Sequence, residues 1–259
     1  MPLSLIVSRR HFFFLIGGGA VLAAGTRSVA AAETRIGRLI VESRGKGTIS
    51  QRIDFLSSAL RGTRYQSDTL IGGPWRSEKF VVRDDAFDCV TFCETVLAAS
   101  IATNRSEFDS VLRTVRYHNG IVAWGERNHY FFEWCQHNVE NNTCRWIPIV
   151  GAVDIEKTVD SQKGISKRRF AMRVIPSSVF LANRNKLERG DIVGFVSRQP
   201  NLDFFHTGFI AFGKTGALLL RHASKSRHRV LDERIEQFVT ANGVRYVSLL
   251  RPQEPRAIV

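Results

Sequence analysis

The sequence has few cysteines, few methionines and comparatively few acidic residues. Its 259 residues include four cysteines, two methionines, and 24 acidic against 37 basic residues, for a formal net charge of +13. No cysteine falls within the first 32 residues, which excludes a lipid-anchored lipoprotein. Beyond residue 25 there is no glycine-rich phosphate loop, dinucleotide fingerprint, repeat or low-complexity tract. No apolar run reaches the ~20 residues that a membrane-spanning helix needs.

The first 32 residues have the layout of an export signal. The arginine pair Arg9-Arg10 precedes a mildly apolar run over residues 12–24, and three alanines end at residue 32. We therefore expect a twin-arginine-type signal peptide over 1–32 and a single mature domain over 33–259. That domain would be periplasmic or otherwise exported, with no stable membrane insertion after cleavage. An uncleaved anchor is the alternative, and the shortness of the run argues against it.

The remaining charge is basic but scattered. Removing the three arginines of the signal lowers the formal net charge from +13 to +10. Only residues 157–173 and 221–229 concentrate basic side chains, and an exported protein rarely meets nucleic acid. We expect no nucleic-acid partner, and attraction to anionic envelope polymers or acidic peptides instead. The sequence leaves the oligomeric state open.

Apolar periodicity separates a helical first part from a strand-rich second part. Helices are predicted over 49–60, 87–102, 107–116 and 231–240, and strands over 191–197, 207–212, 217–221 and 245–250. Residues 69–75 are predicted as a loop, and the polar residues 151–166 as an insertion over the site. Helices followed by β-rich runs indicate an α+β fold with helices packed on a central antiparallel sheet.

Cys89 lies in the first turn of the most apolar predicted helix, with Asp88 as its N-cap. Free N–H groups and positive partial charge at a helix start lower a thiol pKa and can hold an oxyanion. The alternative is a buried structural cysteine, which fits Cys93. Cys135 and Cys144 flank a polar stretch and are placed for a disulfide, although their pairing stays open.

Two histidines on successive predicted strands match Cys89. His206 begins one strand, and a histidine at a strand start beside a cysteine at a helix start suits thiol activation. His222, on the next strand, would orient that imidazole. Taken singly, each histidine is more often a surface or core residue. Asp203 is predicted to be a turn residue rather than the acid of a catalytic triad.

Several segments resemble the N-acetylmuramoyl-L-alanine amidase-like branch of the NlpC-type cell-wall cysteine hydrolases. These segments are FDCVTFCE, ERNHYFFEW, LERGDIVGFVS, LDFFHTGFIAF and LLLRHASK, within residues 65–250. The resemblance implies a papain-like fold with Cys89 as nucleophile, His206 as base and His222 as orienting residue. It also implies cleavage of the N-acetylmuramic acid–L-alanine bond in peptidoglycan fragments. Cys93 stands where an aliphatic residue is expected. We expect neither a cofactor nor a metal.

Candidate substrate-binding residues lie beside these groups or in the Arg-Asn-His-Tyr element. They are Tyr65, Asp88, Arg127, Asn128, His129, Tyr130 and Ser224. Arg127 would pair with a peptide carboxylate, and Asn128 and Tyr130 would bind amide or sugar groups. The alternative is a loop folded back by a buried Tyr130. Tyr65 either donates a hydrogen bond near the thiolate or packs as an aromatic.

Three other functions stay open. An endopeptidase of the same fold would cut between D-glutamate and the diamino acid, and a wall-binding module would use Cys89 only structurally. A zinc hydrolase would need ligands beyond Cys89 and Cys93, which have no matching second pair.

Overall fold

The structure is a computed structural model that describes residues 34–255, so the signal predicted over residues 1–32 lies outside it. Within this range no helix is long and apolar enough to cross a membrane. The described helices are α1 (Arg35–Ser43), α2 (Ile49–Ala59), α3 (Cys89–Ile101), α4 (Arg105–Arg116), α5 (Phe131–Glu140), α6 (Ser177–Ala182) and α7 (Ile235–Ala241). Short 3-10 turns span Arg44–Lys46, His118–Gly120, Trp124–Glu126 and Arg184–Lys186.

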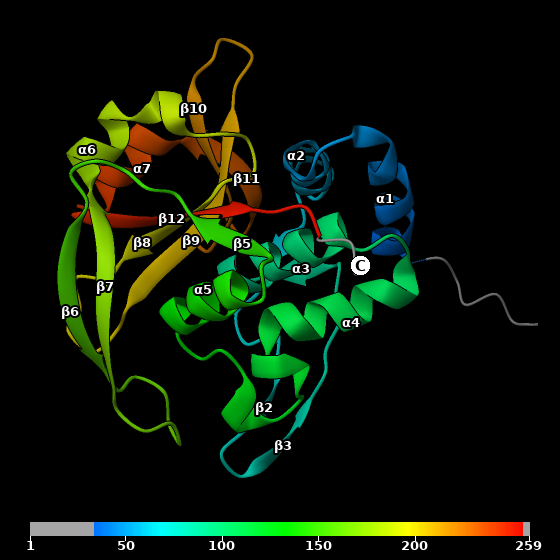
Figure 1. The fold of residues 1–259 in the computed structure, drawn as a ribbon. Helices are drawn as coiled ribbons and strands as arrows, with labels where there is room; N and C mark the ends of the chain where they lie inside the picture. Colours follow the sequence, from blue (N-terminus) through cyan, green and yellow to red (C-terminus); the bar gives the residue numbers. More distant parts are fainter. Residues whose placement is uncertain (1–33, 256–259) are drawn as a thin grey trace, which may run out of the picture. The chain divides into compact units, whose positions relative to one another are not determined.

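One large curled sheet runs through the fold, and a small hairpin lies apart from it (Figure 1). The sheet order is β4-β1-β11-β10-β9-β8-β12-β7-β6, with β5 also paired to β12, and the hairpin is β2–β3. The strands are β1 (Arg64–Tyr65), β2 (Ile71–Gly73), β3 (Arg76–Lys79), β4 (Ala86–Phe87), β5 (Cys144–Trp146), β6 (Val153–Val159), β7 (Arg168–Pro176), β8 (Ile192–Val196), β9 (Phe204–Phe212), β10 (Leu218–Ser224), β11 (Arg229–Arg234) and β12 (Tyr246–Pro252).

The sheet is mixed, which corrects the expected antiparallel sheet at one edge. β1 and β4 run parallel, with Tyr65 opposite Phe87, while the other pairs are antiparallel. Parallel neighbours need a connection long enough to bring the chain back in the same direction. Residues 66–85, which include the β2–β3 hairpin, supply that connection. The α+β class is confirmed.

Successive residues of the central strands point into two different cores. Phe209 on β9 joins the core covered by α1 to α5, whereas its neighbour Ile210 joins the core under α6 and α7. On β10, Ala223 lies in the core covered by α1 to α5, whereas Leu220 lies in the core under α6 and α7. This alternation follows from the period of two in a strand. The sheet therefore separates the five N-terminal helices from α6 and α7 (Figure 1).

Helix α3 is central because its sequence is apolar on all sides. Every residue from Thr91 to Ile101 is buried, and the helix packs against α2, α4 and β9. A helix that is hydrophobic all round is stable only where neighbours cover every face. The predicted helices over 49–60, 87–102 and 107–116 are confirmed, as are the four predicted strands, with shifted ends.

Three segments differ from the sequence-based expectation. Residues 231–240 begin as the end of β11, and only from Ile235 does α7 follow. Residues 151–166, predicted only as a polar insertion over the site, contain β6, which pairs with β7 along its whole length. The predicted loop over 69–75 contains β2 and the turn into β3. In each case pairing with a second strand decided the conformation, and local propensity does not carry that information.

Candidate active site

Cys89 is the first residue of α3, and Asp88 caps the helix. The Asp88 carboxylate accepts hydrogen bonds from the backbone N–H of Val90 (2.9 Å) and of Thr91 (2.7 Å). The Thr91 hydroxyl accepts in return from the Asp88 N–H at 3.0 Å, completing a capping box. The N-cap predicted from the sequence is thus confirmed. Because Asp88 engages the Val90 and Thr91 donors, the N–H of Cys89 itself stays clear of the carboxylate.

The sulfur of Cys89 lies beside β9 where the β9–β10 ladder ends, a place that we call the strand opening. β9 and β10 are paired as far as Phe209 and Arg221, beyond which β10 continues beside β11 alone. At this opening the backbone N–H of Thr207 is close enough to the Cys89 thiol to oppose the rise in its pKa. The sulfur is therefore near the residue that directly follows His206.

The two histidines meet across the same opening. His206 Nε2 and His222 Nδ1 are 2.5 Å apart, and the rings are nearly perpendicular. On the far side of His222, its Nε2 lies 2.9 Å from a carboxylate oxygen of Glu233 on β11. That oxygen is off the axis of a ring N–H, so the contact is an ion-pair distance without a well-formed hydrogen bond.

The thiol and the imidazoles approach this opening from opposite faces of the sheet. His206 lies opposite Phe195 in register and packs on Phe238 of α7, with ring centroids 5.3 Å apart. Helix α3 packs on the other face, from which Cys89 reaches the opening. Within residues 34–255 no hydrogen bond joins the Cys89 sulfur to either imidazole. The contact between the two imidazoles engages Nε2 of His206, so Nδ1 is the ring nitrogen of His206 that remains available.

Burial reverses the expected effect of the helix start on the thiol. Cys89 keeps some exposed surface as a residue, but enclosure of its sulfur raises the thiol pKa to about 12. The nearby Asp88 carboxylate raises the pKa further, and backbone N–H groups, including that of Thr207, offset this only in part. The expectation of a lowered thiol pKa is wrong for this resting state, because desolvation outweighs the helix terminus.

The imidazoles are held neutral. Burial lowers the pKa of His206 to about 3, with a further contribution from His222, and burial lowers the pKa of His222 to about 4. Phe195, Phe205 and Phe238 pack on the His206 ring and give it largely apolar surroundings. At neutral pH the resting site therefore holds a thiol and two uncharged rings.

Tyr65 and Ser224 border this region from two strands. Burial raises the pKa of the Tyr65 hydroxyl, and the Cys89 and Asp88 charges raise it further, which places the phenol near both groups. Ser224 is buried, and its hydroxyl accepts from the N–H of Arg227 at 3.3 Å in the β10–β11 turn. Its hydroxyl is therefore engaged in shaping that turn.

The Arg-Asn-His-Tyr element has mixed surroundings. The Arg127 guanidinium donates to Glu78 at 2.9 Å, and His129 Nε2 lies 2.6 Å from the Trp124 carbonyl oxygen. Burial lowers the pKa of His129 to about 4. Arg127, Asn128 and His129 line a polar cavity of about 250 Å³.

Tyr130 does not take part in that cavity. Its side chain is only 1% exposed, and its hydroxyl accepts a hydrogen bond from the backbone N–H of Gln162 at 3.4 Å. Phe131, the next residue, is 8% exposed and packs on Trp134. The packed-loop alternative therefore describes Tyr130, which offers no surface to a substrate in this conformation.

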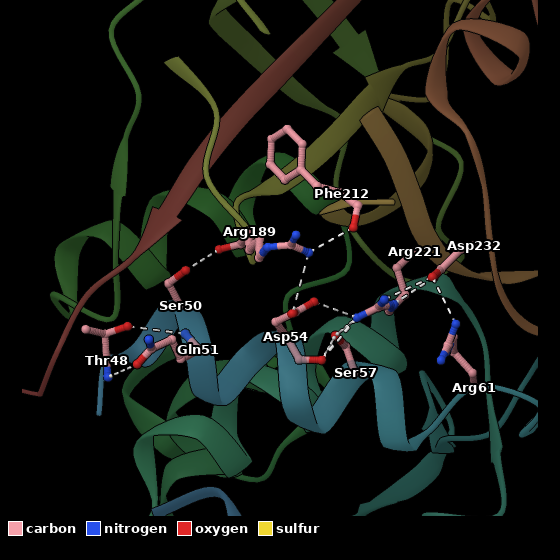
Figure 2. Close-up of polar contacts among 10 residues, drawn as sticks. All are labelled: Thr48, Ser50, Gln51, Asp54, Ser57, Arg61, Arg189, Phe212, Arg221 and Asp232. Carbon is pink, nitrogen blue, oxygen red and sulfur yellow. Dashed lines mark hydrogen bonds and ion pairs between the residues drawn. The ribbon is translucent and has the colours of Figure 1, made fainter. Parts of the chain in front are cut away.

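A buried charge network anchors β10 to α2 (Figure 2). Arg221, directly before His222, donates to Asp232 at 2.7 and 2.9 Å and to Asp54 at 2.9 Å. It also donates to the hydroxyl of Ser57 at 3.1 Å. Because side chains alternate along a strand, this network holds β10 from the face opposite the His222 ring.

The other cysteines are separate thiols. Cys93 is buried one turn below Cys89, with its sulfur 3.8 Å from the Thr207 hydroxyl. Cys135 and Cys144 are buried and unbridged, so the possible disulfide is absent here. Among residues 34–255 no three His, Cys, Asp or Glu side chains converge as metal ligands would.

Sequence reasoning missed several neighbours of the histidines. Thr207 and Phe238 contact the site through pairing and packing that have no local sequence signal. Glu233 fell within a predicted helix, although the apolar spacing of Ile235, Phe238 and Val239 marks a helix that starts later. Asp203 accepts from the Phe132 N–H at 2.8 Å, so it joins the β8–β9 loop to α5.

These features define an α+β protein with a cysteine at the start of a buried helix, near a pair of strand histidines. The family model described as AmiA-like, N-acetylmuramoyl-L-alanine amidase-like, matches residues 55–244. The chain therefore belongs to the AmiA-like family, and the resemblance seen in the sequence motifs is confirmed at that level. A comparison with curated protein sequences finds no match.

Solved structures show the same fold. The protein LPG0564 from Legionella pneumophila, of family DUF1460, superposes with a TM-score of 0.73 at 20% identity, covering 86% of this chain and 96% of that one. An N-acetylmuramoyl-L-alanine amidase from Bacteroides uniformis superposes with a TM-score of 0.68 at 19% identity, covering 85% of this chain and 100% of that one. At this identity the likeness concerns the fold.

Proposed function

We propose that this protein is an exported, papain-like cysteine amidase that hydrolyses the N-acetylmuramic acid–L-alanine bond of peptidoglycan fragments. The observation that carries the proposal is the Cys89 sulfur at the start of α3, close to the backbone N–H of the residue that follows His206. His206 is in turn bonded to His222. The amidase-like family supports the reaction class, and a peptidoglycan substrate suits it.

In the proposed first step, His206 Nδ1 takes the proton of the Cys89 thiol as the sulfur attacks the lactyl carbonyl carbon. The raised thiol pKa and the lowered imidazole pKa favour proton transfer during the attack over a preformed ion pair. The carbonyl oxygen becomes an oxyanion. The N–H of Cys89, which Asp88 leaves free, is positioned to stabilise it.

The tetrahedral intermediate then collapses. The carbon–nitrogen bond breaks, the L-alanine amine leaves with the proton from His206, and a thioester joins the lactyl group to Cys89. Water gives a proton to His206 and attacks the thioester carbonyl. Release of the carboxylic acid restores the thiol, so no oxidant or cofactor is consumed.

We propose that Arg127, Asn128 and His129 form one wall of the substrate site. The three residues line one polar cavity of about 250 Å³, which supports this proposal. Glu78 already neutralises Arg127, so we expect this wall to select by shape and hydrogen bonding more than by charge. Tyr65 and Asp88 would border the thiol from the other side.

Cys89→Ala tests the reaction directly. The wild-type protein should release the free peptide beginning with L-alanine from a defined muropeptide, leaving the intact sugar, as seen by mass spectrometry. The variant should lose at least about 1,000-fold in rate, because a covalent catalyst loses its nucleophile. Cys93→Ala is the matched control, since that thiol is one turn deeper and buried.

Three other outcomes would contradict the proposal. A stem peptide cut between D-glutamate and the diamino acid would identify an endopeptidase instead. Equal, slow alkylation of Cys89 and Cys93 by iodoacetamide at pH 6, without any product, would identify a wall-binding module. Loss of activity on adding a chelator would point to a zinc hydrolase.

A further inference from the structure

A carboxylate lies on the side of His222 that faces away from His206. Glu233 lies opposite Leu220 in the β10–β11 ladder, so the two side chains share one face of the sheet. His222 is two residues beyond Leu220 on β10 and therefore lies on the same face. Its Oε1 is 2.9 Å from His222 Nε2, and the His222 side chain is only 2% exposed. The Glu233 side chain is 30% exposed, so it can rotate into line with the ring.

We propose that Glu233 is a positioning residue that sets the tautomer of His222 and, through it, the tautomer of His206. The proposal rests on the proposed function, because it assigns to His206 the task of taking the thiol proton. It adds a fourth member to the chain of Cys89, His206 and His222.

The argument follows the protons of two neutral rings. A neutral imidazole carries one N–H, so its two nitrogens play opposite roles. A carboxylate only accepts, and it therefore favours the His222 tautomer with hydrogen on Nε2. His222 Nδ1 must then accept from His206 Nε2, across the 2.5 Å contact. His206 Nδ1 keeps its lone pair and is ready to take the thiol proton.

The opposite arrangement would be unproductive. If His222 carried hydrogen on Nδ1, it would donate to His206 Nε2, and the His206 hydrogen would move to Nδ1. That nitrogen would have no lone pair for the Cys89 thiol. Apart from Glu233, no group within the described residues distinguishes the two arrangements, because Nε2 of His222 has no hydrogen-bond partner there.

Glu233 also counters the charge that forms during the reaction. His206 becomes an imidazolium among Phe195, Phe205 and Phe238, an apolar surrounding that disfavours a positive charge. A carboxylate one ring away offsets part of that cost. Burial raises the pKa of Glu233, and the nearby charge of Arg227 offsets this only in part.

The test compares E233A and E233Q in the full protein, with E156Q as control. Glu156 is an exposed carboxylate on β6, in a different part of the sheet. On a defined muropeptide, E233A should lower kcat about 10- to 100-fold, the range seen when the outer hydrogen-bond partner of a functional histidine is removed. KM should stay within about twofold, because Glu233 does not touch substrate. E233Q should lose less, since its amide oxygen still accepts from Nε2.

A second readout does not depend on activity. In ¹⁵N-labelled protein, NMR should show wild-type His222 with hydrogen on Nε2, and E233A should shift it toward the other tautomer. An unchanged kcat in E233A, or a lowered kcat with an unchanged His222 tautomer, overturns the proposal. A tautomer shift in a protein that cleaves no muropeptide supports the positioning by Glu233 and refutes the proposed function instead.

Discussion

Two regions of this molecule gather histidines, and they differ in what lies beside them. His206 and His222 meet at the opening between β9 and β10, where Cys89 at the start of α3 comes within reach of the same backbone. His118 and His137 stack with centroids 4.4 Å apart on the wall of the 250 Å³ cavity that also contains His129. The second region holds more histidines and has no thiol among its lining residues.

The difference shows what a histidine needs in order to become a base. In the polar cavity the rings are engaged by neighbours: His118 lies 3.3 Å from Glu126, and His137 lies 2.5 Å from the Asn128 side-chain oxygen. At the strand opening, His206 has one ring nitrogen engaged and the other uncommitted. Clustering alone is therefore a weak signal. A helix-terminal thiol and a second ring that fixes the tautomer set the first region apart.

Replacing one histidine from each region should separate them most sharply. His206→Ala should lower the rate of muropeptide cleavage by about 1,000-fold or more, because the base and the leaving-group acid are both lost. His118→Ala should change kcat by less than about threefold and act mainly on KM, because its exposed ring lines the proposed substrate cavity and has no part in the proton transfers. Steady-state kinetics on one substrate provide the measurement. Similar losses in both variants would remove the distinction between the regions.

The charge network that anchors the first region should contribute more to stability than an exposed ion pair elsewhere on the sheet. Arg221→Met leaves the carboxylates of Asp54 and Asp232 without their partner on the strand of His222. We expect the free energy of unfolding to fall by about 2–4 kcal/mol, somewhat below a fully buried pair because Asp54 is partly exposed. Arg169→Met, which breaks an exposed pair with Glu156, should leave the free energy of unfolding nearly unchanged. Urea unfolding at pH 7 measures both, and equal losses would contradict the anchoring role.

Stability against pH should show the smallest effect and a common sign in both regions. Burial lowers the pKa of His222 and of His129 to about 4, against about 6.5 in the unfolded chain. Between these values the unfolded state binds more protons, so each histidine makes stability fall as the pH drops below about 6.5. Between pH 7 and pH 5 the free energy of unfolding should fall by about 1–2 kcal/mol less in His222→Gln than in the wild type. The same difference is expected for His129→Gln. Urea unfolding at the two pH values tests this, and a steeper loss in either variant would reverse the sign.

Much of the fold was accessible from the sequence where the pattern was strong. The apolar run of α3 and the residues around Asp88 predicted a buried, N-capped helix, and the structure has one. The β-rich runs of β8, β9, β10 and β12 were equally clear. The boundary between β11 and α7 was not clear from the sequence, which allows a helix there. Pairing with β10 extends β11 to Arg234.

The candidate site shows the same distinction between what the local sequence predicts and what only the fold decides. Cys89, His206 and His222 stand out by residue type and local position, so the sequence alone identifies them as candidates. It does not show that burial raises the pKa of the thiol, that Tyr130 turns inward, or that Glu233 stands behind His222. Each of these depends on neighbours distant in the chain.

The sequence by itself determined the family, the α+β class and the helix that presents Cys89, because these depend on local patterns and short motifs. Only the tertiary structure decided that β9 and β10 separate after Phe209, that Thr207 reaches the thiol, and that the two imidazoles share one contact. The physical reason is that strand pairing and desolvation are set by the whole fold. No single segment carries the energy of a contact made with another.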